Sequence, residues 1–376
     1  MSINFPLSES LRKLKPYEPG RPIEEVERQY GLKRVIKLAS NENPLGPSPY
    51  AREAVAKVVG EMHRYPDGSA FRLRQKLSGV WGVTGKQLVF GNGSNEVIDM
   101  LVRTFCQPGD AILQPQYSFI AYAIAAQVHG ARVVDAKVRE DLSVDVDVLL
   151  EALNEDPEIR IVFLANPNNP TGAEVSEPDI ERLVTAVESR ATPTLLVLDT
   201  AYDEYLSDAK DPVGKRWLDR SANVVVLKTF SKIYGLAALR VGYGVGHEQV
   251  IQSVERARQP FNVNALALEG ALAALEDHKF VARARTENAE GLQMWGAFLD
   301  RIDIRYAPSR ANFILADLSS RGVDGRRFFE AAMQKGLILR PVGGYGLPAS
   351  VRISVGTRAE NEAAFEIFEA VLKSFS

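Results

Sequence analysis

A lysine and several side chains that could bind an anion follow a run of apolar, mostly β-branched residues at 224–227, a pattern typical of a buried strand that ends in polar residues. The neutral amine of a lysine can attack a carbonyl carbon, and Lys232 is our candidate for this nucleophile. Thr229, Ser231 and Arg240 bring hydroxyl and guanidinium donors that could bind an anion beside it. An ordinary surface loop could carry the same residues, so the interpretation depends on what other segments add.

Polar residues also follow four other predicted strands. In open α/β sheets, ligands bind beyond the carboxyl ends of the strands, because loops and helix N-termini converge there. We therefore expect these residues to share one crevice with Lys232. They are Gly93, Ser94 and Asn95 at the start of a helix, Tyr117, Asn169, and the pair Asp199 and Tyr202.

One cofactor with a phosphate, a pyridine ring and an aldehyde would use all of these groups. The backbone amides at 93–95, at a helix N-terminus, can bind the phosphate. Tyr117 can stack on the ring, while Asn169 and Tyr202 can donate hydrogen bonds to a ring oxygen. Asp199, at a buried strand end, can keep the ring nitrogen protonated, which makes the ring an electron sink, and the lysine amine can bond to the aldehyde.

Short apolar runs alternate with helical patterns between residues 86 and 245. This alternation predicts an α/β fold in which the large domain has a mostly parallel seven-stranded sheet sandwiched by helices. A helical stretch at 265–299 leads to a smaller α+β domain with antiparallel strands. We divide the chain into an extended, Pro-rich N-terminal arm with part of the small domain (1–45), a large cofactor-binding domain (46–275) and a small C-terminal domain (276–376).

Composition limits the class of protein. The 376 residues are 45% hydrophobic and 25% charged with a formal net charge of -3, which is ordinary for a globular protein and predicts no surface for nucleic acid or anionic membranes. No segment approaches the roughly 20 apolar residues that cross a bilayer. Cys106 is the only cysteine, so we expect no disulfide within the chain and a cytoplasmic setting, and the four separated histidines predict no metal site.

Three motifs carry a resemblance to a known family. The NPTG stretch at 169–172, the pair Asp199 and Tyr202, and Ser231-Lys232 followed eight residues later by Arg240 resemble the fold-type I pyridoxal-phosphate-dependent aminotransferases. The resemblance covers nearly the whole chain. It implies that pyridoxal 5′-phosphate is the cofactor and that Lys232 both bonds to it and moves the substrate proton.

Within this group the chain is most similar to the histidinol-phosphate aminotransferases. The similarity implies an amino transfer between L-glutamate and imidazole-acetol phosphate that gives 2-oxoglutarate and L-histidinol phosphate in L-histidine biosynthesis. It also implies a homodimer with shared active sites, in which Tyr65 reaches the cofactor phosphate of the neighbouring subunit. The stretches that carry the similarity are 14–32, 37–49, 64–77, 311–315 and 339–357.

The same resemblance implies how the substrate is bound. Arg352 would grip the substrate anion, because a planar guanidinium can bind either a carboxylate or a phosphate with paired hydrogen bonds. Arg340, Tyr17 and Asn43 would complete this grip.

The chain departs from the family near the expected substrate. Ile120 stands three residues after Tyr117, where some members carry a tyrosine, and Tyr122 is the candidate to replace it. Gly343 and Gly344 are smaller than the residues expected before Tyr345.

Other functions stay open at this point. An aromatic or broad-specificity amino-acid aminotransferase would share the cofactor site, and so would a pyridoxal-phosphate-dependent decarboxylase of a phosphorylated amino acid. The effector-binding half of a transcription regulator is disfavoured, because no helix-turn-helix pattern or basic cluster precedes Leu14.

Overall fold

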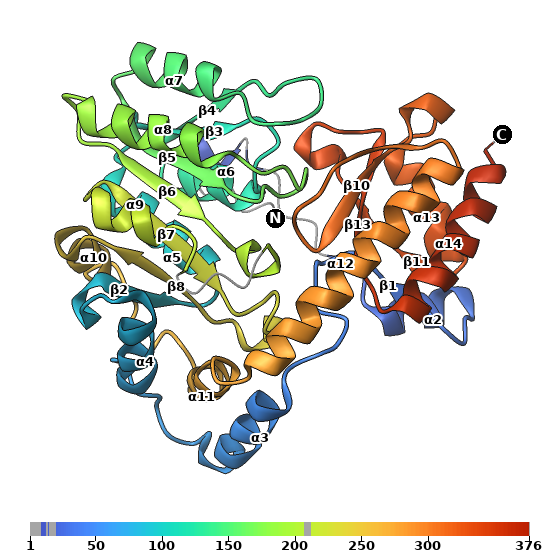
Figure 1. Ribbon diagram of the computed structural model, residues 1–376, viewed down its shortest axis with the longest axis horizontal. Coiled ribbons are helices and arrows are strands. Elements are labelled where there is room, and N and C mark those ends of the chain that lie inside the picture. The colour runs from blue at the N-terminus through green and yellow to red at the C-terminus, as the bar shows by residue number, and fades with distance from the viewer. Residues whose placement is uncertain (1–8, 13, 15–19, 207–211, 376) are drawn as a thin grey trace, which may run out of the picture.

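A seven-stranded sheet forms the centre of the larger part of the computed structural model, which describes residues 9–12, 14, 20–206 and 212–375 (Figure 1). Only β8 runs antiparallel to its neighbours, and the remaining pairs are parallel. The predicted mostly parallel sheet is therefore confirmed. In spatial order its strands are β2 (Leu88–Gly91), β8 (Gly242–Gly246), β7 (Val224–Thr229), β6 (Leu195–Asp199), β5 (Ile159–Ala165), β3 (Ala111–Pro115) and β4 (Arg132–Ala136).

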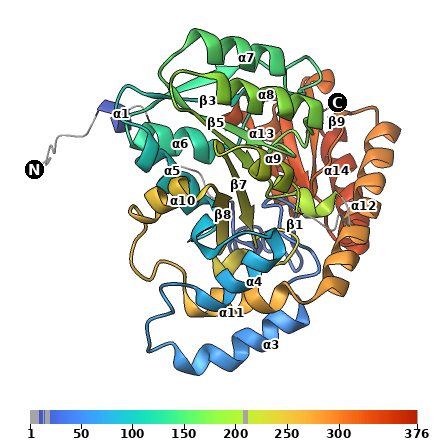
Figure 2. The same ribbon diagram turned by 60° about the vertical axis from the view of Figure 1, so that its left-hand side comes forward.

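Both faces of this sheet are covered by helices, because successive side chains of a strand point to opposite faces. In β7, Val224 and Val226 pack in one hydrophobic cluster, whereas Val225 and Leu227 pack in the other. Figure 2 shows α5, α6 and α10 gathered on one side of the sheet. That side carries α5 (Ser94–Phe105), α6 (Ile120–Val128) and α10 (Glu248–Glu255), and the other carries α3 (Pro49–Val58), α4 (Phe71–Trp81), α7 (Val146–Glu155), α8 (Glu177–Ser189), α9 (Lys215–Arg220) and α11 (Ala265–Ala274).

Helix α8 shows why such a segment is helical. The side chain of Ser176 caps its first turn by accepting a hydrogen bond from the backbone N–H of Asp179. Apolar side chains then recur at Ile180, Leu183, Val184 and Val187, a spacing that places all of them on one buried face of the helix. The sequence thus fixes both the start of the helix and the face that it turns to the sheet.

The C-terminal part has its own sheets and core. Four antiparallel strands follow the order β12-β13-β10-β9, and a two-stranded parallel sheet joins β1 to β11. Trp295, Phe298, Phe328 and Phe368 are buried in its hydrophobic cluster. The predicted smaller α+β unit is confirmed. Its elements are β1 (Ile36–Lys37), β9 (Arg305–Ala307), β10 (Phe313–Asp317), β11 (Leu337–Ile338), β12 (Arg340–Pro341), β13 (Ser350–Ser354), α12 (His278–Arg301), α13 (Gly325–Gln334) and α14 (Arg358–Lys373).

The N-terminal arm is not wholly extended, so that expectation is wrong. Helix α1 spans Glu9–Arg12, and α2 spans Ile23–Tyr30. Helix α2 begins after Pro22, at a position where a backbone N–H is not needed, and it ends at Gly31 with a left-handed φ of 66°. Buried Val26 packs with residues of α13 and β11 in one cluster, so the arm joins the small sheets.

The helical stretch expected at 265–299 is interrupted. Helix α11 ends at Ala274, and α12 begins after Asp277, whose carboxylate accepts a hydrogen bond from the N–H of Phe280 at 3.1 Å. A short acidic side chain favours such a helix start over a continuous helix. The break falls beside our proposed boundary at 275–276, and the large clusters of the sheet contain residues 51–274 only.

Within the part of the chain that the structure describes, no helix combines the length and apolarity needed to cross a membrane. The same described residues contain no group of three or more His, Cys, Asp or Glu side chains that could hold a metal ion.

Candidate active site

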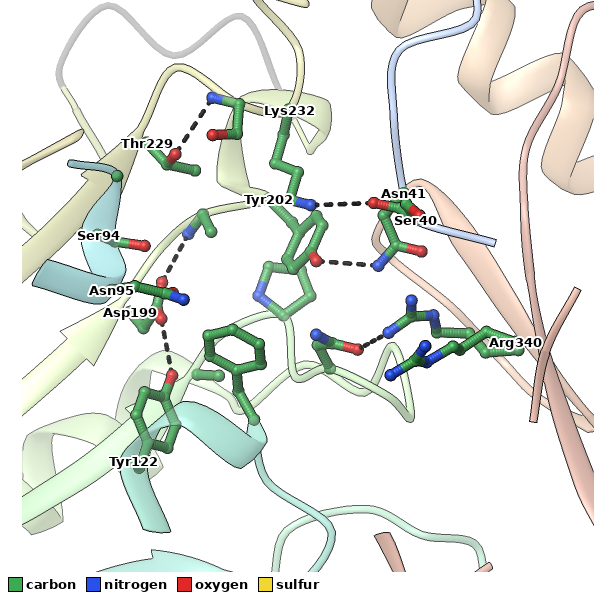
Figure 3. Close-up of a pocket in the computed structure, with 18 of the residues that line it drawn as sticks. Ser40, Asn41, Ser94, Asn95, Tyr122, Asp199, Tyr202, Thr229, Lys232 and Arg340 are labelled. Atoms are coloured by element: carbon green, nitrogen blue, oxygen red, sulfur yellow. Dashed lines mark hydrogen bonds between the residues drawn. The ribbon is translucent and has the colours of Figure 1, made fainter. Parts of the chain in front are cut away.

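A cavity of about 260 Å³ lies at the carboxyl ends of β5, β6 and β7, where the arm and the antiparallel sheet meet the large sheet (Figure 3). It brings together residues that are more than 250 positions apart in the chain, such as Asn41 and Arg352. The residues predicted from sequence that line it are Gly93, Ser94, Asn95, Asn169, Asp199, Tyr202, Thr229, Ser231, Lys232, Arg240, Arg340 and Arg352.

Lys232 extends its amine into this cavity. Its Nζ donates a hydrogen bond to the backbone oxygen of Ser40 at 3.4 Å and lies 5.5 Å from the centre of the Tyr202 ring. Burial, together with the positive charges of Arg352 and Arg240, lowers the pKa of Lys232 to about 8. A neutral, nucleophilic amine is therefore accessible near neutral pH.

Lys228, four residues earlier, has the opposite environment. Its Nζ forms buried ion pairs with Asp203, and with Glu204 at 2.7 Å, both in the short helix η3 (Asp203–Tyr205). These carboxylates raise the pKa of Lys228 despite its burial. Lys228 is held charged outside the cavity, whereas Lys232 lines it.

Asp199 ends β6 with its carboxylate at the cavity wall (Figure 3). The hydroxyl of Tyr122 donates to Oδ2 at 2.7 Å, and the backbone N–H of Ala201 donates to Oδ1 at 3.2 Å. Burial raises the pKa of this carboxyl, while the two hydrogen bonds act in the opposite direction. The sequence analysis named Tyr122 only as a possible replacement for the tyrosine that some family members carry near the substrate.

Tyr202 is positioned from the arm by Asn41, a residue that the sequence analysis missed. The Nδ2 of Asn41 donates to the Tyr202 hydroxyl at 3.0 Å. Ser354 of β13 fixes this amide, because its hydroxyl donates to Oδ1 of Asn41 at 3.0 Å. Asn41 has a left-handed φ of 54°, a conformation that asparagine tolerates better than most residues.

Asn43 does not line the cavity, so its assignment to the substrate is corrected. Its Nδ2 donates to the backbone oxygen of Ile233 at 2.6 Å, and its Oδ1 accepts from the N–H of Leu45 at 3.0 Å. Asn43 therefore links the arm to the backbone next to Lys232. The two asparagines lie in one ASNENP stretch, and the sequence of that stretch does not show which one faces the cavity.

The N-terminus of α5 and Arg240 form an anion-binding corner. The guanidinium of Arg240 donates to the Ser231 hydroxyl at 3.4 Å and to the Asn92 backbone oxygen at 3.3 Å. Two glycines permit this approach, since a Cβ at Gly93 would lie 2.7 Å from Nη2 of Arg240, and a Cβ at Gly242 would lie 2.5 Å from the nitrogen of Ser94. Backbone N–H groups at a helix start beside a guanidinium suit a phosphate.

Arg352 and Arg340 face the opposite end of the cavity. They are paired across the antiparallel strands β13 and β12. Arg352 donates from Nη1 to Oδ1 of Asn169 and from Nη2 to the backbone oxygen of Ala39 at 2.9 Å. The guanidinium also lies 5.3 Å from the centre of the Phe313 ring, which fixes its plane.

Phe119 and Tyr122, rather than Tyr117, are the aromatic residues of this segment that line the cavity. Tyr117 has a left-handed φ of 60°, and a Cβ at Gly346 would lie 3.1 Å from its Cε1, so its ring lies against Gly346. Phe119 immediately precedes α6 and packs edge-on against Tyr122, with ring centres 5.7 Å apart. The sequence analysis named only Tyr117 for the ring face, because the sequence did not show where the helix would begin.

Two further predicted residues lie elsewhere. Tyr65 is 83% exposed and stacks on Phe261 with ring centres 4.8 Å apart, and it does not line the cavity of its own chain. Tyr17 falls outside the described residues.

The donor set of the cavity fits pyridoxal 5′-phosphate. An anion corner lies at Arg240, a carboxylate with fixed oxygens lies at Asp199, and a phenol and an amide lie at Tyr202 and Asn169. The amine of Lys232 has the lowered pKa that bonding to an aldehyde requires.

Comparisons with known proteins agree with this arrangement. Residues 33–368 match the family model "Aminotransferase class I and II". The chain is 41% identical over 364 residues to histidinol-phosphate aminotransferase 1 of Nitrosococcus oceani, covering 96% of this chain and 95% of that protein. It is 44% identical over 359 residues to the histidinol-phosphate aminotransferase of an Anaeromyxobacter species, covering 96% and 97%.

A solved structure extends the likeness to three dimensions. The histidinol-phosphate aminotransferase of Sinorhizobium meliloti, in complex with pyridoxal-5′-phosphate, superposes with a TM-score of 0.87 at 27% identity and covers 98% of each chain. The predicted fold and family are confirmed. The chain belongs to the class I and II aminotransferases, within the group of the histidinol-phosphate aminotransferases.

Proposed function

We propose that this protein binds pyridoxal 5′-phosphate and reversibly transfers an amino group from L-glutamate to imidazole-acetol phosphate, giving 2-oxoglutarate and L-histidinol phosphate. This places it in L-histidine biosynthesis. The observation that carries the proposal is the buried amine of Lys232, whose lowered pKa suits it to an aldehyde, in a cavity that also contains Arg352 and Arg340. The names of the relatives, at 41% and 44% identity over nearly the whole chain, support the substrate.

Each part of the cofactor has a partner in the cavity. The N–H groups at 93–95 and the side chains of Thr229, Ser231 and Arg240 would hold the phosphate. Asn169 and Tyr202 would meet the ring oxygen, Asp199 the ring nitrogen, and Phe119 a face of the ring. When bound, the cofactor supplies an electron sink for a negative charge that develops at the substrate Cα.

The chain itself supplies orientation and proton transfer. Lys232, once released from the aldehyde by the incoming amine, would act as the base that removes the proton from the substrate Cα. Arg352 can bind the carboxylate of glutamate or the phosphate of the other substrate, because both anions match the two donors of a planar guanidinium. Arg340, on the neighbouring strand, adds a second positive charge at this end.

A substrate panel on purified, cofactor-loaded protein tests this proposal. We expect the kcat/KM for histidinol phosphate as amino donor to exceed that for phenylalanine. Arg352→Lys should lower the kcat/KM for histidinol phosphate by roughly tenfold to a hundredfold, because it keeps the charge but loses a paired, charge-assisted hydrogen bond. Cofactor content should not change in this variant. A preference for phenylalanine would identify a broad-specificity aminotransferase, and release of carbon dioxide from a phosphorylated amino acid would identify a decarboxylase.

A homodimer with shared sites is part of the same proposal. Large apolar side chains are exposed together on α3, at the start of α4 and in the loops between them and before α11. Such a patch is typical of a protein interface, and it contains Tyr65, which the cavity of its own chain does not use. The exposed residues are Tyr50, Val59, Met62, Tyr65, Phe71 and Phe261. A cytoplasmic location remains a prediction from the single cysteine.

Mixing two chains that are impaired in different ways tests the shared site. Tyr65→Phe should weaken cofactor binding about tenfold by removing one hydrogen bond to an anion, and Lys232→Ala should remove the nucleophile. In a mixed dimer, the chain that keeps Lys232 would receive Tyr65 from its partner, so one site of the two is intact. We expect the purified mixed dimer, at limiting cofactor, to have about half the activity of the wild-type dimer, because one of its two sites is intact. No gain over the unmixed Tyr65→Phe protein would contradict sharing.

A further inference from the structure

The carboxylate of Asp199 is held at both oxygens by groups of its own chain. The backbone N–H of Ala201 fixes Oδ1, and the phenol of Tyr122 fixes Oδ2 at 2.7 Å. The first bond follows from the local turn after β6. The second joins residues 77 positions apart, from the first turn of α6 to the end of β6.

Tyr122 is itself immobilised by packing. Its ring is fully buried and stacks on Phe163 of β5, with ring centres 4.5 Å apart and planes 4° apart. It also packs against Phe119, which lines the cavity, with the two ring planes 89° apart. The phenol pKa is raised well above its usual value by burial and by the Asp199 carboxylate, so the hydroxyl keeps its proton and donates it to this carboxylate, which can only accept.

We propose that Tyr122 is a positioning residue that keeps Asp199 ionised and aimed at the ring nitrogen of the bound cofactor. The inference rests on the proposed cofactor. It assigns to Tyr122 a role at the ring nitrogen rather than at the substrate, where the departure at Ile120 had suggested it.

The physical reason is a competition for one proton. A buried carboxyl group prefers to be neutral, and burial is the main influence on Asp199, with the charge of Asp203 acting in the same direction. Beside a pyridine nitrogen, the proton can lie on the nitrogen, leaving a carboxylate, or on the carboxyl, leaving a neutral ring. A donor at Oδ2 stabilises the carboxylate more than the neutral carboxyl, so Tyr122 favours the protonated ring, and Lys232 acts on Asp199 in the same direction.

The test replaces Tyr122 by phenylalanine, which keeps the stacked ring and removes the hydroxyl. Wild-type and variant protein are loaded with pyridoxal 5′-phosphate labelled with nitrogen-15, and the ring nitrogen is observed by NMR. We expect the signal to move from the protonated toward the unprotonated position in Tyr122→Phe. We expect kcat to fall roughly tenfold to a hundredfold, the usual loss for one hydrogen bond to a charged group, with no change in KM for glutamate.

Two controls separate the hydrogen bond from packing. Tyr243→Phe removes another buried phenol hydroxyl, one that accepts from Trp81 at 3.1 Å and does not line the cavity, and its nitrogen signal should match wild type. Phe163→Leu removes the stacked ring but keeps the Tyr122 hydroxyl, and it should shift the signal less than Tyr122→Phe. An unchanged signal in Tyr122→Phe, or an equal shift in Phe163→Leu, would overturn the proposal. If wild-type protein bound no cofactor, the proposed function itself would fail instead.

Discussion

Lys232→Ala should lower the rate of amino transfer by at least about a thousandfold, because it removes both the nucleophile for the aldehyde and the base for the substrate proton. The fold should survive the change. The amine lies in a cavity, and its hydrogen bond to Ser40 is long at 3.4 Å, so no packed core is opened. Thermal unfolding followed by circular dichroism checks the second point, and single-turnover kinetics check the first.

Borohydride trapping gives an independent test of the same residue. Reduction of cofactor-loaded wild-type protein should leave a stable label on the peptide that contains Lys232, and the alanine variant should carry none. Lys373→Ala, on the exposed C-terminal helix, is a matched control that should label and turn over as wild type. A label on Lys228, or on any residue other than Lys232, would refute the assignment.

The pKa of Lys232 sets the pH dependence of this labelling. The amine is reactive when neutral, and its pKa is lowered to about 8. Below that pH, the neutral fraction of the amine in cofactor-free protein rises tenfold for each pH unit, and it levels off above it. The initial rate of labelling, with brief exposure to cofactor, should therefore climb between pH 6 and about 8 and flatten beyond it. A rate that still climbs tenfold per unit above pH 9, as for an ordinary lysine, would contradict the lowered pKa.

Asp199→Asn should lower the rate by on the order of a hundredfold to a thousandfold, the usual loss when one electrostatic group is removed from a buried site. Asparagine has nearly the same shape but carries no charge, so it cannot favour a protonated ring nitrogen. The anion corner at Arg240 and the amine of Lys232 are unaltered, and we expect only a modest loss of cofactor. Rate and bound cofactor should be measured on the same samples.

The comparison between these two quantities is decisive for the role of Asp199. If the rate fell only in proportion to bound cofactor, the carboxylate would serve in binding and not in the chemistry. Tyr122→Phe is an intermediate variant for comparison with Asp199→Asn, because it removes one hydrogen bond to the carboxylate and keeps the carboxylate itself. The order of rates should be wild type, then Tyr122→Phe, then Asp199→Asn.

The sequence by itself determined the mostly parallel sheet, the strands that end in polar residues, and most of the residues that line the cavity. The continuous apolar run at 224–227 predicts a strand buried on both faces, and the polar residues that follow it must emerge at the strand end. Because parallel strands share one edge for their carboxyl ends, Asp199, Asn169 and Lys232 were expected together and are found together. Local pattern was sufficient here because strand direction alone brings these residues to one place.

Tertiary structure alone decided the choices between neighbouring residues of similar type. Asn41 rather than Asn43 faces the cavity because Ser354, 313 residues away, anchors it through its backbone and side chain. Phe119 rather than Tyr117 lines it because α6 begins at Ile120 and brings Tyr122 within 2.7 Å of Asp199. A shift of one or two positions along the chain decides whether a side chain lies on the cavity wall or points away from it. Only contacts between distant segments set that position.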